Sequence, residues 1–224
     1  MKNITITGSE GIIGRQLCLH LEKKYKIIKL DLKYGHDLSN EDFVKNWFKK
    51  NKTDYLVNCF ALNDHISSKR QKESLMNISL DSVTNYLNIN ITSLFSVCRE
   101  FVRNNKKGGI INFSSYLGIV SPNPILYPKT DKNLAYCVSK AGVIHLTKYL
   151  AVHLAPNIQI NCISPGGILD KQGKDFVKKY SKLTPMKRMM KKTELNGIVD
   201  FLCSDASKYI TGSNFVIDGG YTSW

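Results

Sequence analysis

Short apolar runs alternate along the chain with longer segments whose apolar residues recur at helical spacing. The strand-like runs are Asn3–Thr7, Lys26–Leu32, Tyr55–Phe60, Gly109–Ser114, Ile158–Ile163 and Asn214–Ile217. The helical patterns are Ile12–Tyr25, Glu41–Asn51, Leu80–Asn104, Leu134–Leu154 and Thr193–Cys203. This alternation predicts an α/β fold, a doubly wound parallel sheet with helices on both faces. Ligands of such sheets bind beyond the carboxyl ends of the strands, so we expect the chemistry there.

The 224 residues contain no linker, repeat or low-complexity tract, which predicts a single domain. The six cysteines are scattered without a C-x-x-C pair, so we expect reduced thiols, a cytoplasmic location and no metal site. An apolar strand begins within a few residues of the start, and no apolar run approaches the roughly 18 residues of a membrane span. Neither a signal peptide nor a membrane span is therefore expected.

A formal net charge of +14 raises the question of a nucleic-acid partner. The lysines come mostly as doublets near the ends of predicted helices, at 23–24, 49–50 and 106–107. Such doublets are typical of solvated faces, so we expect no specific nucleic-acid binding. The lysine-rich segment from Lys171 to Lys192 is an exception and is considered with the substrate.

The first predicted strand leads into a helix through "TGSEGIIG", Thr7 to Gly14. Glycines at Gly8, Gly11 and Gly14 allow a tight turn, close approach of the backbone to a pyrophosphate and close packing of helix on strand. The helix N-terminus supplies free N–H groups and the positive end of its dipole. The position of this motif, after a strand and before a helix, predicts a dinucleotide site.

Two aspartates follow the second predicted strand. A carboxylate at Asp31 would accept hydrogen bonds from the ribose hydroxyls of the cofactor and repel a 2′-phosphate, which favours NAD over NADP. Lys33 could partly offset that repulsion. Asp37 is suited to contact the adenine amino group, or it belongs to the start of the next helix, with Ser39 as its cap. Both interpretations of Asp37 stay open.

The pattern Y-x-x-x-K occurs twice, and its setting differs between the two places. The first pair, Tyr25 to Lys29, runs into a strand-like segment, where residues four apart are about 13 Å from each other. Tyr136 and Lys140 open a helical pattern, so their side chains share one face with Cβ atoms roughly 5–6 Å apart. Only the second pair can form a catalytic unit.

The chain resembles the short-chain dehydrogenase/reductase family along nearly its whole length. The resemblance rests on an ordered set of motifs: "TGSEGIIG", "LVNCFA", "NIN", "INFSS", "AYCVSK", "INCISPGG" and "SKYITGSNFVIDGG". It implies a Rossmann-like fold over residues 1–224 and an NAD(P)-dependent oxidoreductase. It also implies a catalytic group consisting of Asn90, Ser115, Tyr136 and Lys140.

The same resemblance implies the cofactor contacts. They are Gly8, Ser9, Gly11, Ile13, Gly14, Asp31, Asp37, Asn58, Ala61, Tyr136, Lys140, Pro165, Gly166 and Ile168. Asn58 would help to hold the sheet, and the backbone of Ile168 would meet the nicotinamide carboxamide. Asn90 would anchor a water that relays protons, or tie its helix to a neighbour. Gly11-Ile12 in the glycine loop and "NCFA" after the third strand depart from the family pattern, and neither departure removes a catalytic group.

These roles agree with the chemistry of a reaction between an alcohol and a ketone. Tyr136 must exchange a proton near neutral pH, whereas an unperturbed phenol has a pKa near 10. A cation about 4 Å away at an effective dielectric of about 20 contributes up to ~4 kcal/mol, which corresponds to a lowering of the phenol pKa by ~3 units. Lys140 is therefore expected to activate Tyr136 and to hold the ribose, while Ser115 holds the substrate oxygen.

The substrate is expected to meet two segments. The stretch "SPNPILYPKTDKN" directly precedes Tyr136, and Tyr127 or Thr130 could hydrogen-bond a polar substrate. A lid at about 169–193 carries many lysines and Arg188, which suits a phosphate or carboxylate, although a solvated lid explains the charges equally well.

Further stretches resemble the branch of the family associated with flagellin modification and nine-carbon sugar acids, which points to a sugar phosphate or nucleotide-linked sugar. A 3-oxoacyl reductase, a dehydrogenase of free sugar alcohols or a non-catalytic dinucleotide-binding sensor remain alternatives. The resemblance also implies a homodimer or homotetramer, with the helices of Asn90 and Tyr136 as the dimer surface and Trp224 as a further anchor.

Overall fold

The computed structural model describes residues 1–63, 74–128 and 131–224. The strands in these residues form one six-stranded sheet in the order β2-β1-β3-β4-β5-β6, and every neighbouring pair is parallel. Its strands are β1 (Asn3–Thr7), β2 (Lys26–Leu30), β3 (Tyr55–Asn58), β4 (Gly108–Phe113), β5 (Ile158–Pro165) and β6 (Asn214–Ile217).

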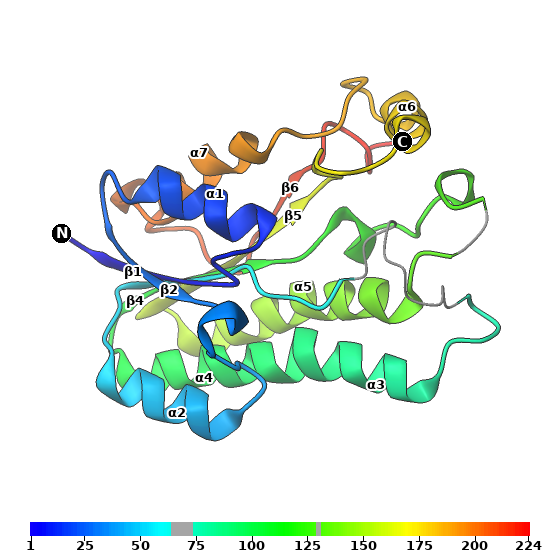
Figure 1. Ribbon diagram of the computed structural model, residues 1–224. Helices are drawn as coiled ribbons and strands as arrows, with labels where there is room; N and C mark the ends of the chain where they lie inside the picture. The colour runs from blue at the N-terminus through cyan, green and yellow to red at the C-terminus, as the bar shows by residue number, and fades with distance from the viewer. Residues whose placement is uncertain (64–73, 129–130) are drawn as a thin grey trace.

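Helices cover both faces of this sheet (Figure 1). On one face lie α1 (Ile12–Leu21) and α7 (Asn196–Leu202). On the other lie α2 (Glu41–Lys50), α3 (Leu80–Leu87), α4 (Leu94–Asn104) and α5 (Leu134–Leu154). The predicted doubly wound, Rossmann-like architecture is therefore confirmed.

Alternation along the strands supplies the two apolar layers. Leu56 on β3 and Ile110 on β4 pack with α2, α4 and α5, whereas their chain neighbours Val57 and Ile111 pack with α1 and α7. Successive strand residues point to opposite faces, so a run of consecutive apolar residues is what a sheet covered on both sides requires. The same runs identified the strands in the sequence.

Most predicted elements are found, and the differences have local causes. The bounds of β1, β6 and α5 are as predicted. The predicted helix Leu80–Asn104 contains a π-helical turn at Asn88–Ser93, between α3 and α4. The Ser93 hydroxyl donates to the Asn88 carbonyl oxygen at 2.9 Å, which spans the widened turn. Such turns are frequent at functional sites.

Two other predictions need correction. Ser39 is not the cap of α2, because Asn40 accepts the hydrogen bond from the Phe43 N–H. The helices predicted from apolar spacing did not include α6 (Lys174–Leu183). Charged side chains outnumber apolar ones in this helix, so the apolar spacing is weak there. This helix lies beyond one end of the sheet, beside the C-terminus (Figure 1).

The strand order reverses at β1, which has β2 on one side and β3 on the other. Loops diverge from such a reversal at the carboxyl ends of the strands and leave a crevice there. The segments that follow β1, β3, β4 and β5 carry most of the predicted site. Among the residues that the structure describes, no helix is both long enough and apolar enough to cross a membrane.

Candidate active site

The glycine turn after β1 has the close contacts that its sequence predicts. Gly8 has a φ of +62°, and a Cβ added there would lie 2.6 Å from the Phe60 backbone nitrogen. The Gly11 N–H donates to the Gly8 carbonyl oxygen at 3.0 Å. A Cβ on Gly14 would lie 2.2 Å from the same oxygen. Side chains at Gly8 and Gly14 would therefore push β1, α1 and the loop after β3 apart.

The N-terminus of α1 is suited to an anionic group. Gly11 is its N-cap residue, so no side chain caps the helix, and its first turn holds no acidic residue. The buried hydroxyl of Ser9 has no hydrogen-bond partner in the described part of the chain. Unpaired N–H groups and an unpaired hydroxyl beside a helix N-terminus fit the pyrophosphate of a dinucleotide. Ile13 packs partly buried in the apolar layer of α1.

Asp31 directly follows β2 and faces the glycine turn. One carboxylate oxygen accepts a hydrogen bond from the Glu10 N–H at 2.9 Å, and the other accepts from the Lys33 N–H at 2.9 Å. Asp37 lies farther along, where it accepts hydrogen bonds from the N–H and the hydroxyl of Ser39. The structure thus places Asp31 beside the turn, while Asp37 organises the approach to α2.

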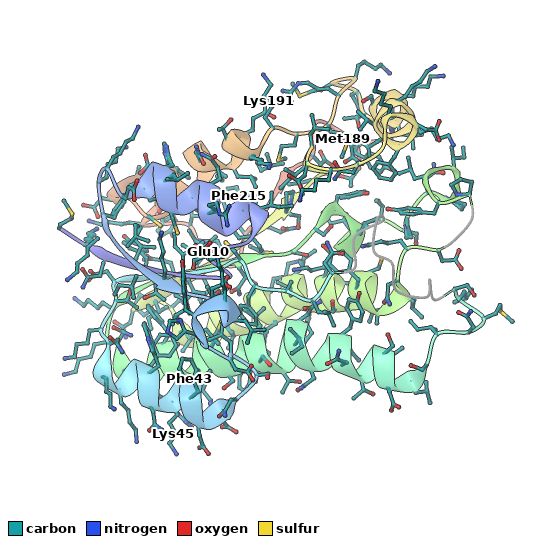
Figure 2. The ribbon with its side chains drawn as sticks, viewed as in Figure 1. Glu10, Phe43, Lys45, Met189, Lys191 and Phe215 are labelled. Carbon is teal, nitrogen blue, oxygen red and sulfur yellow. The ribbon has the colours of Figure 1, made fainter. Side chains whose placement is uncertain are left out.

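Glu10, which was not assigned from the sequence and is labelled in Figure 2, pairs with two cations near Asp31. Its carboxylate accepts hydrogen bonds from the Tyr34 hydroxyl at 2.7 Å, from Arg15 at 3.0 Å and from Lys33 at 3.3 Å. The Tyr34 hydrogen bond, with Lys33 and Arg15, lowers the pKa of Glu10 to about 2. Lys33 is therefore engaged by a carboxylate. Glu10 lies more than 20 residues from Lys33 and Tyr34 in the chain, so its role could not be predicted from local sequence patterns.

Asn58 links three strands at their carboxyl ends. Its amide donates to the Asn112 side chain at 2.9 Å and its carbonyl accepts from the Thr7 hydroxyl at 3.1 Å. Asn112 in turn donates to the Thr147 hydroxyl on α5 at 3.0 Å. This chain of buried hydrogen bonds connects β1, β3, β4 and α5, in agreement with the sheet-holding role expected for Asn58.

Ser115, Tyr136 and Lys140 lie together where β4 ends. The phenol of Tyr136 is hydrogen-bonded to Ser115, and the Lys140 Nζ lies 5.7 Å from the centroid of the Tyr136 ring. The hydroxyl of Ser114 points elsewhere and donates to the Lys140 backbone carbonyl at 2.6 Å. Geometry therefore favours Ser115 over Ser114 as the partner of Tyr136. The helical pairing of Tyr136 and Lys140 is confirmed, as is the strand position of Lys29.

Burial dominates the titration of this pair. It raises the pKa of Tyr136 to about 12, although the hydrogen bond with Ser115 lowers it, and it lowers the pKa of Lys140 to about 8. The Lys140 Nζ donates to the Phe113 carbonyl oxygen at 2.8 Å. The expected lowering of the phenol pKa by Lys140 is therefore absent, because the ammonium group is directed at a carbonyl and the phenol is desolvated.

Asn90 lies in the π-helical turn and ties it to the loop after β3. Its side chain accepts from the Leu62 N–H at 2.7 Å and donates to the Leu62 carbonyl oxygen at 3.1 Å. It also donates to the Ser139 hydroxyl on α5 at 2.9 Å. The tie between elements is thus present, and the proton relay stays a prediction.

The segments after β3 and β5 flank the Tyr136 region. Ala61 is exposed at the end of the first. In the second, Pro165 ends β5 and the Gly166 N–H donates to the Ile217 carbonyl oxygen. Ile168 and Met190 form a parallel β-bridge, in which the Leu169 N–H donates to the Met190 carbonyl oxygen and the Met190 N–H donates to the Gly167 carbonyl oxygen. The N–H of Ile168 itself takes no part in the bridge and points away from it. This orientation leaves the N–H available for the expected carboxamide contact.

Aromatic side chains that the sequence analysis missed surround Tyr136. Tyr180 on α6 accepts a hydrogen bond from the Gly167 N–H at 2.6 Å and stacks on Tyr221, with ring centroids 5.1 Å apart. The Tyr116 ring lies 4.8 Å from that of Tyr221. Tyr127, expected at the substrate, packs on Phe176 of α6. Thr130 lies outside the described residues. The lid helix is thus docked on the segment after β5.

Several lid charges are already paired. Arg188 forms a two-pronged ion pair with Glu194 at 2.6 and 2.7 Å. Lys192 pairs with Asp170 at 2.7 Å, and Lys179 with Asp175 at 2.8 Å. A substrate phosphate would have to compete with these carboxylates, so the charges carry less weight as a substrate signal than the sequence suggested.

The six cysteines are free thiols, four of them buried, and the described residues contain no group of three or more possible metal ligands.

Comparison with known proteins relates most of the chain to one family. A family model described as "Enoyl-(Acyl carrier protein) reductase" matches residues 16–222. The "Post-translational flagellin modification protein A" of Campylobacter coli is 31% identical over 250 aligned positions, which cover 98% of each chain.

Two further relatives carry names that describe an activity. The D-arabinitol 2-dehydrogenase (ribulose-forming) of Scheffersomyces stipitis is 37% identical over 138 positions, which cover 58% of this chain and 48% of the relative. A solved structure of a short chain dehydrogenase from Leptospira borgpetersenii, with bound NAD+, is 32% identical with a TM-score of 0.87. That match covers 99% of this chain and 92% of the other.

Proposed function

This chain belongs to the short-chain dehydrogenase/reductase family and is an NAD(P)-dependent oxidoreductase, and we propose that it interconverts a secondary alcohol and a ketone with Tyr136 as the acid/base. The observation that carries the proposal is the arrangement of Tyr136, Ser115 and Lys140 at the carboxyl end of β4.

Each of the three side chains has a distinct task. The Ser115 hydroxyl holds the substrate oxygen beside the phenol, to which it is already hydrogen-bonded. Tyr136 gives its proton to that oxygen in ketone reduction and takes it back in alcohol oxidation. Lys140, one helical turn from the phenol, would hold the ribose of the cofactor beside it. Asn90 ties the helix of this pair to the loop after β3.

The cofactor residues of this chain fit a dinucleotide. A nicotinamide group, when bound, supplies or accepts the hydride. Gly8, Gly11 and Gly14 form the turn for its pyrophosphate, with the unpaired Ser9 hydroxyl beside them. Asp31 and Asp37 serve the adenosine half, and the segment from Pro165 to Ile168, together with Ala61 and Asn58, borders the nicotinamide.

We favour NAD over NADP because two carboxylates occupy the ribose end of this site. Asp31 would repel a 2′-phosphate. Lys33 and Arg15, which could otherwise bind that phosphate, are both paired with Glu10. A phosphate would have to displace Glu10 before either cation could bind it.

A polar or anionic sugar-type substrate is supported by the names of two relatives. One is a flagellin modification protein, and another oxidises a sugar alcohol. Hydroxyl groups of tyrosines border the catalytic tyrosine, and they provide donors for such a molecule.

Assembly and location are part of the same proposal. Members of the family are commonly oligomers, and α5 presents exposed apolar residues that suit a dimer surface: Leu134, Val138, Tyr149 and Val152. Trp224 is 74% exposed, with Lys187 over its ring, and is available as a further anchor. A homodimer or homotetramer in the cytoplasm is therefore the expected form.

The proposal is tested by incubating the purified protein and NAD+ with sugar alcohols, sugar phosphates and nucleotide sugars, while following the absorbance of the reduced nicotinamide. The same panel is run with 3-hydroxyacyl thioesters and with NADP+. Turnover of a sugar-type alcohol supports the proposal, whereas turnover of the thioesters alone supports the acyl alternative. Dinucleotide binding without turnover across the panel would favour the sensor.

A further inference from the structure

Lys132 places a second ammonium group at the ring of Tyr136. Its Nζ lies 4.4 Å from the ring centroid, closer than the 5.7 Å of Lys140. The two lysines stand four residues before and four residues after the tyrosine. The family pattern accounts for Lys140 alone.

The position of Lys132 is fixed from both sides. Asn133, the next residue, is the N-cap of α5 and accepts a hydrogen bond from the Tyr136 N–H at 3.1 Å. The Lys132 Nζ donates to the Asn63 side chain at 2.6 Å, in the loop after β3. The ammonium group is thus hydrogen-bonded to the loop after β3, while the Lys132 backbone directly precedes the N-cap of α5.

The other ionisable side chains packed with Tyr136 are mainly phenols and a thiol. They include Tyr116, Tyr127, Cys137, Tyr180 and Tyr221. The carboxylate of Asp131, next to Lys132 in the chain, accepts a hydrogen bond from the Leu75 N–H at 2.8 Å. Burial raises the pKa of each of these phenol and thiol groups. In the described part of the chain, the positive charge at the ring therefore comes from Lys132 and Lys140.

The two lysines differ in burial. Lys140 is fully buried and hydrogen-bonded to Phe113, and burial together with the charge of Lys132 lowers its own pKa. Lys132 is only half-buried, so its ammonium group loses less hydration. A cation near an aromatic ring is attracted to its electron-rich face, and the attraction grows when the phenol gains a full negative charge.

We propose that Lys132 is an activating cation of this site, whose ammonium group stabilises the ionised form of Tyr136. Lys132 acts through the tyrosine, as a positioning residue, and does not itself transfer the proton. The inference rests on the proposed function in that Tyr136 is the acid/base.

The test measures the ionisation of Tyr136 directly. Tyr136, and no other tyrosine, is replaced by difluorotyrosine. The fluorines lower the pKa of this phenol into a range where the chain stays folded, and fluorine NMR follows its ionisation. The label is placed in the parent and in Lys132→Met, Lys132→Arg and Lys45→Met. Lys45 is an exposed lysine of α2, remote from the site, so its loss changes the net charge equally (Figure 2).

We expect Lys132→Met to raise the titration midpoint by about 1 pH unit. Lys132→Arg, which keeps the charge, and Lys45→Met should leave the midpoint within a few tenths of a unit of the parent. A midpoint in Lys132→Met equal to that of the parent would overturn the inference. So would an equal rise in Lys45→Met, because net charge alone would then explain it.

Circular dichroism and NADH binding show whether each variant is folded. If Lys132→Met fails to fold, Lys132→Gln replaces it, with the same expected rise. The label reports ionisation whether or not a substrate is known. If Lys132→Met leaves the midpoint unshifted while Tyr136→Phe abolishes turnover, only the role of Lys132 is refuted. If turnover survives in Tyr136→Phe, the proposed function is refuted instead.

Discussion

Lys140 Nζ lies 5.7 Å from the centre of the Tyr136 ring, one helical turn along α5, and both side chains are buried. Burial favours the neutral form of each group, so the pKa of the lysine falls to about 8 and that of the phenol rises to about 12. The pair is therefore costly to bury in its charged forms, which is typical of groups kept for chemistry and not for stability.

The buried Lys140 predicts a dependence of stability on pH. Its pKa is about 8 in the folded chain and near 10.5 when unfolded. Between these values the unfolded chain binds the extra proton, so the free energy of unfolding rises with pH. Relative to Lys140→Met, the parent should gain about 3 kcal/mol across this window. Urea unfolding of both proteins near the two ends of the window measures the gain.

The comparison with Lys140→Met removes the other contributions. Ionisation of Tyr136 and other groups occurs in both proteins, and the lost hydrogen bond to Phe113 is the same at every pH. A difference in stability that does not change with pH would contradict the folded-state pKa of Lys140.

Two glycines inside helices should respond oppositely to alanine. Gly14→Ala places a methyl group 2.2 Å from the Gly8 carbonyl oxygen, and we expect a loss of about 1–3 kcal/mol together with loss of NADH binding. Gly197 on α7 has open space around it, so Gly197→Ala should raise stability by about 0.5–1 kcal/mol and keep NADH binding. Chemical denaturation and the fluorescence of bound NADH provide both readouts. Normal binding in Gly14→Ala would argue against the glycine turn as the dinucleotide site.

Glu10 should control the choice between the two dinucleotides. Glu10→Gln removes the negative charge that engages Lys33 and Arg15, so both cations can reach a 2′-phosphate. We expect the ratio of the dissociation constants, NADPH over NADH, to fall about tenfold. Glu22→Gln, at an exposed position after α1, is the matched control and should leave the ratio unchanged. An unchanged ratio in Glu10→Gln would show that Asp31 alone excludes the phosphate.

The parts predicted from sequence are those that local spacing determines. The apolar positions of α5 fix its face against the sheet, and the i, i+4 relation then brings Tyr136 and Lys140 together. Runs of consecutive apolar residues identified strands covered on both faces. The Gly8 and Gly14 contacts followed from a motif whose function depends on missing side chains.

The parts that were missed depend on contacts between distant segments. The π-helical turn at Asn88–Ser93 preserves the apolar pattern on either side, so it looks like plain helix in the sequence. Lys132 and Glu10 look like surface charges until Asn63 and Tyr34 are folded against them. The pKa of Tyr136 was misjudged because the sequence gives the distance to Lys140 but not the burial of the phenol.

The most direct measurement of the central claim compares Tyr136→Phe with the parent, using an alcohol that the parent oxidises. The variant lacks the hydroxyl to which we assign the proton exchange, and it retains the ring. We expect the rate of hydride transfer in a single turnover to fall at least about a thousandfold, while the dissociation constant for NADH changes less than about threefold. A variant that turns over at a tenth of the parent rate or more would contradict Tyr136 as the acid/base.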